Sequence, residues 1–349
     1  MNTSSRLVWL ALGLTASVGL AHAAESGAYK VVASAKVGGA GGFDYVQADP
    51  DGRRLYIPRG APANHVTVYD LDSLKYVGEI AETAGVHGAA IDPKSHHGFS
   101  SSKPVVMWDT QTLATIKTIT VEGNPDGIFF EPLTERIYVL SHRAPNVTVL
   151  DGKDGSIVGT IDLGGAPEQA QSDGQGKVFI DVEDKASVAV VDAKALKVIG
   201  NYDLSSKAST PAGLALDVKN RILFACCREP ATCVILNADD GKIVASLPLA
   251  GSSDGAVFNP ATMEAFSSHG NGTLSIIKEN SPTSFVIEQD LQTKAGAKTC
   301  TLDDKTGRIL LITADRAPAP APAPGDAPRK GGRGGAMVPD SFSILAVGK

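Results

Sequence analysis

Residues 131–161 read EPLTERIYVLSHRAPNVTVLDGKDGSIVGTI, and this stretch contains most of a unit that recurs along the chain. The stretch opens with an acidic residue before proline and continues with an apolar segment centred on Tyr138. An alternating segment then ends in Asp151, and a fourth segment follows a Gly- and Asp-containing turn. Period-two alternation, β-branched residues and the turn residues between segments indicate short β-strands.

The unit recurs with a period of about 43 residues, which is in the range of propeller repeats. Its acidic or Asn anchor stands at Asp49, Asp92, Glu131, Asp173, Asp217, Asn259 and Asp303. Four short strands per repeat are typical of a propeller blade, because one four-stranded sheet cannot bury both of its faces alone. The sequence therefore predicts an all-β fold, a seven-bladed β-propeller.

The last repeat indicates how the ring closes. Its third strand is expected at residues 342–347, and no fourth strand follows. Residues 29–37 have strand character but no repeat of their own. Because an open ring would leave unpaired strand edges, we predict that residues 29–37 supply the missing strand beside residues 342–347 and close the ring.

Two segments differ in composition from the repeats. Arg6, the apolar run 7–20 and the small residues around His22 predict a signal peptide over residues 1–23, cleaved near Ala23. Residues 24–349 are then expected to form one propeller domain that is periplasmic or secreted. Residues 317–339 are rich in Pro, Ala and Gly and predict a disordered insertion in blade seven.

The overall charge and the cysteine content exclude several classes of protein. With 32 Lys and Arg against 38 Asp and Glu, the chain is mildly acidic, which argues against nucleic acid as a partner. No segment after residue 23 has the roughly 20 apolar residues of a membrane span. The four cysteines are too few for a disulfide framework. A bridge from Cys233 to Cys226 or Cys227, and buried free thiols including Cys300, both remain open.

Short motifs in the repeats resemble those of a known family. The segments YVLS (138–141) and LYIP (55–58), with GFDY (42–45), GVHG (85–88) and GNPD (123–126), resemble the YVTN repeats of bacterial YncE-like periplasmic proteins. The resemblance extends from about residue 29 to the end of the sequence. It implies a seven-bladed propeller with a periplasmic binding or scaffold role. DNA binding has been attributed to some members, but this chain shows no basic groove for it.

Candidate functional residues share one position of the repeat, five residues before the anchor. That position holds Asp44, His87, Asp126, Glu168, Ala212, Asp254 and Lys298. Because the innermost strand begins there, we expect the six ionisable side chains to surround one mouth of the central channel. Crowded carboxylates raise a pKa or recruit a cation, whereas a hydrated rim without function would show the same residue types.

Loops between second and third strands are expected on the same face and add further polar residues. They contribute Arg59, His142, Arg143, Glu183, Arg228 and His269. Asp126, Glu168 and Asp254 together with His87 are candidate ligands of a divalent metal, because carboxylates suit Ca²⁺ or Mg²⁺ and imidazole admits Zn²⁺ or Mn²⁺. The sequence identifies no other cofactor motif.

The favoured function at this stage is binding of a small ligand, an ion or a protein partner at the channel mouth, without catalysis. The chain shows no recognisable pairing of a nucleophile with a base. One alternative is a metal-assisted lyase or lactone hydrolase at the same face, with His87 or Lys298 moving a proton. A second alternative is a partner subunit of a periplasmic redox enzyme.

Overall fold

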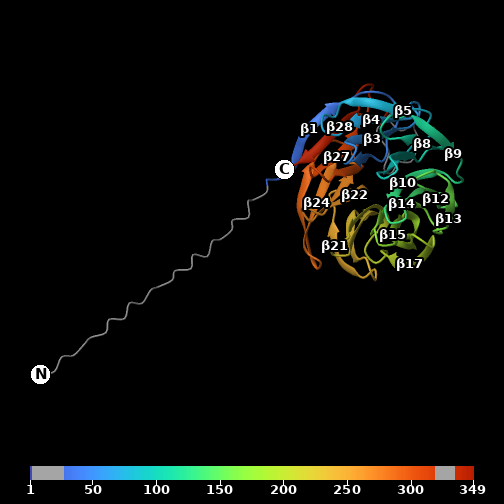
Figure 1. The fold of residues 1–349 in the computed structure, drawn as a ribbon. Helices are drawn as coiled ribbons and strands as arrows, with labels where there is room; N and C mark the ends of the chain where they lie inside the picture. Colours follow the sequence, from blue (N-terminus) through green and yellow to red (C-terminus); the bar gives the residue numbers. More distant parts are fainter. Residues whose placement is uncertain (2–26, 319–334) are drawn as a thin grey trace, which may run out of the picture.

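The computed structural model describes residue 1, residues 27–318 and residues 335–349, so the predicted signal peptide lies almost entirely outside the described residues. The described chain forms seven sheets of four strands each, arranged in a ring (Figure 1). The predicted all-β, seven-bladed propeller is confirmed. Its short helical element within these residues is the 3₁₀ turn η1 (Glu183–Lys185).

Six blades each consist of four consecutive antiparallel strands. Blade one holds β2 (Gln47–Asp49), β3 (Arg54–Arg59), β4 (His65–Asp70) and β5 (Tyr76–Ile80). Blade two holds β6 (Ala89–Asp92), β7 (His97–Ser100), β8 (Val105–Asp109) and β9 (Thr115–Ile119). Blade three holds β10 (Pro125–Glu131), β11 (Arg136–Ser141), β12 (Val147–Asp151) and β13 (Ile157–Ile161).

The next three blades repeat this order. Blade four holds β14 (Pro167–Ser172), β15 (Lys177–Val182), β16 (Ser187–Asp192) and β17 (Lys197–Asp203). Blade five holds β18 (Ser209–Asp217), β19 (Ile222–Glu229), β20 (Thr232–Asn237) and β21 (Ile243–Pro248). Blade six holds β22 (Ser253–Asn259), β23 (Glu264–His269), β24 (Thr273–Ser281) and β25 (Ser284–Gln292). First strands of neighbouring blades contact one another, so they line the central channel.

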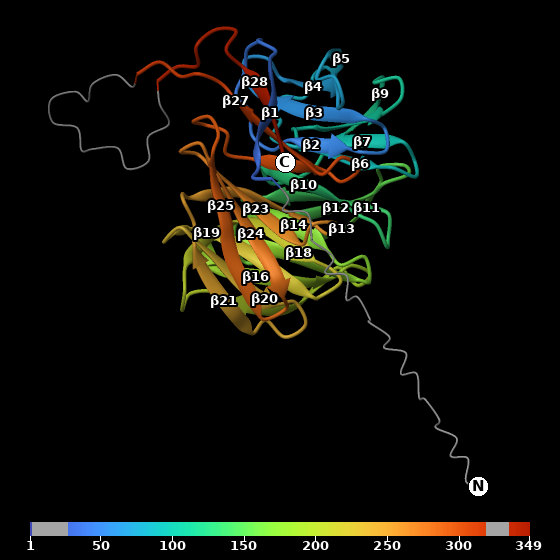
Figure 2. The ribbon, with the colours of Figure 1, turned by 90° about the vertical axis from the view of Figure 1, so that its left-hand side faces the viewer.

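Blade seven joins the two ends of the described chain. It contains β26 (Cys300–Asp303), β27 (Arg308–Thr313), β28 (Ser343–Gly348) and, as its outermost strand, β1 (Lys30–Lys36). β1 pairs antiparallel with β28, from residue 30 opposite residue 348 to residue 36 opposite residue 343 (Figure 2). Tyr29 extends this contact to blade six, because its ring packs edge-on against Phe266 at 5.2 Å between centroids.

The core lies between the blades. The aromatic residue at the centre of each second strand is fully buried in six of the repeats, as Tyr56, Phe99, Tyr138, Phe179, Phe224 and Phe266. Burying one such side chain contributes about 1.5–3 kcal/mol relative to leaving it exposed. The same repeat position that marks the strands in the sequence therefore also supplies the contacts between blades.

The four cysteines are free and buried. Cys226 and Cys233 lie directly opposite each other on β19 and β20, yet they remain thiols. Of the two interpretations that the sequence left open, the structure has the buried thiols, which pack as small apolar side chains.

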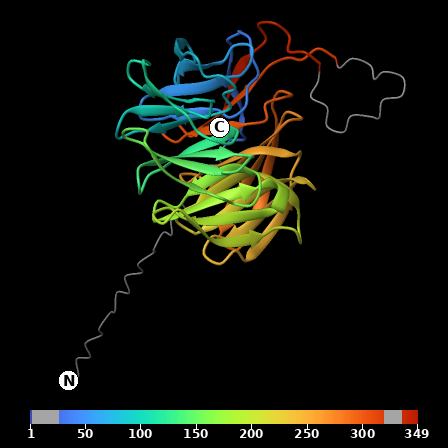
Figure 3. The same ribbon diagram turned by 90° about the vertical axis from the view of Figure 1, so that its right-hand side faces the viewer.

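The insertion of blade seven is ordered at its base. The Ala317 N–H donates to the Ala336 carbonyl at 2.9 Å, and the Val338 N–H donates to the Asp315 carbonyl at 2.8 Å. Backbone pairing thus continues past β27 and before β28 at both ends of residues 317–339, and the disorder expected for this segment stays a prediction. Residues 319–334 lie outside the described part of the chain (Figure 3). Among the described residues, no helix is long and apolar enough to cross a membrane.

Candidate functional site

The six residues that share one repeat position come together at one end of the channel. Starting from Asp44, Oδ2 lies 2.9 Å from His87 Nδ1, which in turn lies 3.0 Å from Asp126 Oδ1. Asp126 Oδ2 then lies 3.1 Å from Nε2 of His142. His142 follows β11 directly, and its Nε2 is 3.7 Å from Glu168 Oε1.

The second half of the circuit returns to its start. Glu168 Oε1 lies 3.7 Å from Arg228 Nη1, and Arg228 Nη2 lies 2.5 Å from Asp254 Oδ1. Lys298 Nζ then lies 2.6 Å from Asp254 Oδ2 and 2.8 Å from Asp44 Oδ1. The result is a closed circuit in which acidic and basic side chains alternate. We call it the charged ring: Asp44, His87, Asp126, His142, Glu168, Arg228, Asp254 and Lys298.

Blade five explains why Arg228 belongs to the ring. Its residue at the shared position is Ala212, which has no polar side chain. Arg228, near the end of β19, occupies the gap between Glu168 of blade four and Asp254 of blade six. Glu183 contacts the same guanidinium at 2.5 Å from outside the ring.

Interactions within the ring favour the charged forms of His142, His87 and Asp44. The hydrogen bond to Asp126 raises the pKa of His142 to about 9, although burial acts against the charged form. The hydrogen bond to Asp44 likewise raises the pKa of His87. Burial would raise the pKa of Asp44, but His87 and Lys298 outweigh it and lower that pKa to about 2.

Glu168 has a raised pKa, unlike Asp44. Burial raises its pKa to about 8; Arg228 opposes this shift, whereas Glu183 and Asp126 add to it. The Tyr45 hydroxyl donates a hydrogen bond to Glu168 Oε2 at 3.0 Å. Burial raises the pKa of that hydroxyl well above its usual value, so Tyr45 stays a donor. The carboxyl group of Glu168 therefore titrates near neutral pH.

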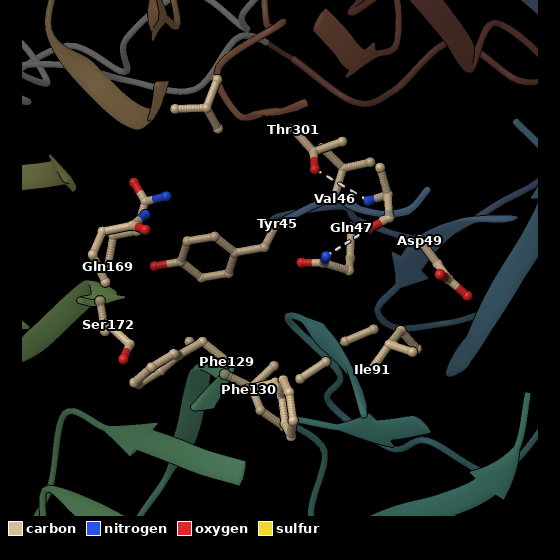
Figure 4. Close-up of a pocket in the computed structure, with 18 of the residues that line it drawn as sticks. Tyr45, Val46, Gln47, Asp49, Ile91, Phe129, Phe130, Gln169, Ser172 and Thr301 are labelled. Atoms are coloured by element: carbon tan, nitrogen blue, oxygen red, sulfur yellow. Dashed lines mark hydrogen bonds between the residues drawn. The ribbon is translucent and has the colours of Figure 1, made fainter. Parts of the chain in front are cut away.

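A cavity of about 430 Å³ lies in the channel next to the ring (Figure 4). Glu168 and Tyr45 line it, so they belong both to the ring end and to the cavity wall. The lining continues along the first strands with Phe129 and Phe130 of β10. It reaches the turns that follow β2, β6 and β10, so the cavity extends toward the face opposite the ring.

Gln169 closes one side of this cavity. Its Oε1 accepts hydrogen bonds from the Leu214 N–H at 2.9 Å and the Ala256 N–H at 3.0 Å, and its Nε2 donates to the Ala256 carbonyl at 2.9 Å. One amide side chain of blade four thus joins the first strands of blades five and six. Figure 4 shows Gln169 and Tyr45 on the wall of the cavity.

Solved structures share this architecture. A crystal structure of RRP9 WD40 repeats matches with a TM-score of 0.71 over 91% of this chain and 97% of that chain, at 12% sequence identity. A crystal structure of the Mitotic Checkpoint Complex contains a chain that matches with a TM-score of 0.65 over 89% of this chain and 96% of its own, also at 12% identity.

The chain has the fold of WD40-repeat propellers. At this level of identity the likeness establishes the fold alone, because propellers carry unrelated functions. No protein-family model matches the sequence, and no curated protein matches it. Membership of the YVTN/YncE-like family therefore stays a prediction.

Four expected members of the binding face lie outside the ring: Arg59, Arg143, Glu183 and His269. Arg59 is buried, stacks over the Phe342 ring at 3.8 Å and donates to the Gly38 carbonyl at 3.2 Å. His269 is buried among hydroxyl groups, and burial lowers its pKa to about 4. Arg59 thus packs against the residues that flank β1 and β28 of blade seven, whereas His269 stays within blade six. Arg143 is exposed beside His142 and makes no contact with the ring within the described residues.

Two groups within the described residues have the ligand types of a metal site. Asp44, His87 and Asp126 form one, and Asp126, His142 and Glu168 form the other, each with its candidate ligand atoms within 4.8 Å of one another. Asp254, which the sequence also nominated as a ligand, belongs to neither group, because Arg228 and Lys298 pair with its two oxygens.

The sequence also carries a signal that distinguishes His142 and Arg228 from Arg59 and His269. Both stand eleven residues after their anchors, Glu131 and Asp217, whereas Arg59 and His269 stand ten residues after theirs. Side chains alternate along a strand, so this offset of one residue separates the side chains that join the ring from the buried side chains Arg59 and His269. No repeat signal marks Tyr45, since it occurs in one blade only.

Proposed function

We propose that this propeller binds a small molecule in the channel beneath the charged ring, as a binding protein rather than an enzyme. The observation that carries the proposal is that Glu168 belongs both to the ring and to the wall of a cavity of about 430 Å³, where Tyr45 of the same wall donates a hydrogen bond to it. Cavities of this size suit small ligands, and a few convergent polar groups on an apolar wall provide orientation.

The proposal includes the finer expectations from the sequence. We propose that the protein is a YVTN/YncE-like propeller exported to the periplasm after cleavage near Ala23. The repeats and the pattern of residues 1–23 support this part. Expression with the full leader, followed by N-terminal sequencing of the recovered protein, tests it. Recovery of uncleaved protein in the cytoplasm alone would contradict export.

A substitution that fills the cavity tests the binding function. Gln47 lies half-buried on the wall, and its amide projects into the cavity (Figure 4). Gln47→Trp is therefore expected to obstruct the channel while leaving the blade contacts intact. The probes are benzamidine, benzyl alcohol and benzoate, which share one aromatic ring and differ in charge. Ligand-observed NMR with the full chain should show at least one probe binding, with that signal lost in Gln47→Trp at an unchanged melting temperature. If none responds to the substitution, the proposal is wrong.

A second candidate, a metal-assisted enzyme at the ring, is favoured by the two His–carboxylate groups. His142 has a pKa of about 9 and therefore carries a proton at neutral pH. A metal at Asp126, His142 and Glu168 would have to displace that proton. Equilibrium dialysis with Zn²⁺ and Mn²⁺ separates the candidates. Binding of one equivalent that is lost in Asp126→Asn would favour the enzyme, whereas no retained metal would favour the binding protein.

A further inference from the structure

The charged residues that line the cavity all have the same sign. They are Asp49, Asp51 and Glu168, and no Lys, Arg or His of the described chain lines the cavity. The basic members of the ring lie outside the wall and are paired with the ring carboxylates. A ligand in the channel therefore meets acidic side chains directly, whereas the cations that pair with Asp51 and Glu168 lie outside the lining.

The three carboxylates are not equally available. Asp51 pairs with Lys305 at 2.6 Å, and Asp49 accepts a hydrogen bond from the Gly52 N–H at 2.9 Å. Both lie at the end of the cavity opposite the ring. Glu168 lies at the ring end, and its side chain is only 9% exposed.

The two oxygens of Glu168 face different surroundings. Oε1 is the atom approached by His142 and Arg228, at 3.7 Å from each. Oε2 accepts the hydrogen bond from Tyr45, which is itself part of the cavity wall. The carboxyl group thus presents one oxygen to the ring and the other to the tyrosine of the cavity.

Aromatic rings stand on the same wall. Phe129 and Phe130 of β10 are only partly buried, although their strand is the innermost of its blade, and Figure 4 shows both on the cavity wall. The face of an aromatic ring attracts a cation that lies within about 6 Å of its centre. The same rings provide an apolar surface for the body of a ligand.

We propose that the ligand is a small organic cation with an apolar body, such as an amine, an amidine or a quaternary ammonium compound. The inference rests on the proposed function and specifies the ligand class for the same cavity. The cationic group would lie near Glu168 and Tyr45, and the apolar body would pack against Phe129 and Phe130. An anion of equal shape would meet like charges and no base, which disfavours it.

The shape-matched probes decide this inference on the unsubstituted protein. Titration by isothermal calorimetry at pH 8.5 should give benzamidine an affinity about tenfold or more above that of benzyl alcohol, with benzoate weaker still. If benzyl alcohol or benzoate binds as tightly as benzamidine and is blocked by Gln47→Trp, the inference is overturned while the binding function stands. If Gln47→Trp affects none of the three probes, both proposals are overturned.

Substitutions then locate the charge that matters. Glu168→Gln preserves shape and should weaken benzamidine about tenfold while changing benzyl alcohol by less than about twofold. The matched control is Glu229→Gln, an exposed residue next to Arg228 that does not line the cavity. An equal loss of benzamidine in both variants would contradict the assignment to Glu168. If Glu168→Gln does not fold, the ranking of the probes still decides the ligand class.

Discussion

Ion pairs join the blades at both ends of the channel, but they are built differently. At the end opposite the ring, Arg53 and Arg221 stand four residues after their anchors, and each has a positive φ, 51° and 59°. Arg53 reaches the anchor Asp303 of the preceding blade at 2.8 Å, and Arg221 reaches the anchor Asp173 at 3.0 Å. These Arg clips, as we call the two Arg–anchor pairs, each join two neighbouring blades.

The charged ring contains groups that the clips lack. The clips use Arg and Asp, which keep their charge across the neutral range. The ring includes His142 and Glu168, whose pKa values of about 9 and about 8 lie close to neutrality. Glu168 also lines the cavity. An ion pair between blades therefore indicates by itself only that the blades are joined. A functional site is indicated where one of the paired residues also titrates near neutral pH and lines a cavity.

The largest expected effect comes from removing the arginine of the ring. Arg228→Ala leaves Glu168, Glu183 and Asp254 without their shared partner and should lower the free energy of unfolding by about 2–3 kcal/mol. Arg53→Ala, the comparison variant, should cost about 1–2 kcal/mol, because Thr306 still donates to the Asp303 carboxylate. Urea denaturation at pH 7 measures both. A greater loss for Arg53→Ala would break the distinction between the ring and the clips.

The second effect is a dependence of stability on pH that belongs to the ring. The raised pKa of His142, from 6.5 to about 9, means that its stabilising contribution is complete below 6.5 and is lost as pH rises through 9. The raised pKa of Glu168 likewise lowers the stability as pH rises, up to about pH 8. Because the two groups are coupled and His142 is partly exposed, we expect a total loss on the order of 1 kcal/mol.

A pair of variants assigns this pH dependence. Asp126, Glu168 and Glu183 all favour the charged form of His142, so His142→Gln should flatten the decrease in unfolding free energy between pH 6.5 and 9. Arg53→Ala should retain the decrease, because the clip contains no group that titrates there. Urea titrations at several pH values measure the slope. An unchanged slope in His142→Gln would exclude His142 as its cause and leave Glu168 as the titrating group of the ring.

The smallest effect is expected at an exposed pair on the side of the clips. Lys94 and Glu135 join blades two and three, but both side chains are largely exposed to solvent. Exposed pairs contribute little, because solvent screens their charges. Lys94→Ala should therefore leave the melting temperature unchanged in a thermal shift assay. A decrease as large as that of Arg53→Ala would show that burial does not separate the two kinds of pair.

The repeat made the fold and part of the site predictable. A residue at a fixed position of each blade occupies an equivalent place around the channel axis. The repeat position five residues before the anchor therefore predicted that Asp44, Asp126 and Lys298 lie on one ring. His142 and Arg228 were placed on the correct face but not in the ring. Whether such a side chain joins the ring depends on the side of the strand on which it lies, and this side changes with a shift of one residue.

The cavity could not be predicted from the repeat. Its volume depends on side chains that differ between blades, such as Gln169, which joins three blades through its amide. Tyr45 reaches Glu168 across two intervening blades, at a separation of 123 residues. Contacts of this kind arise from packing around the channel and leave no periodic pattern.

The pairing of β1 with β28 also has a consequence for synthesis of the chain. Six sheets are built from consecutive strands, so all four strands of each sheet are present once its own segment has been synthesised. The sheet of blade seven must wait, because residue 30 pairs with residue 348. Contacts between distant segments form slowly, since a long loop must close first. β1 therefore remains without its neighbour until almost the whole described chain has been synthesised, and the sheet of blade seven is the last to be completed.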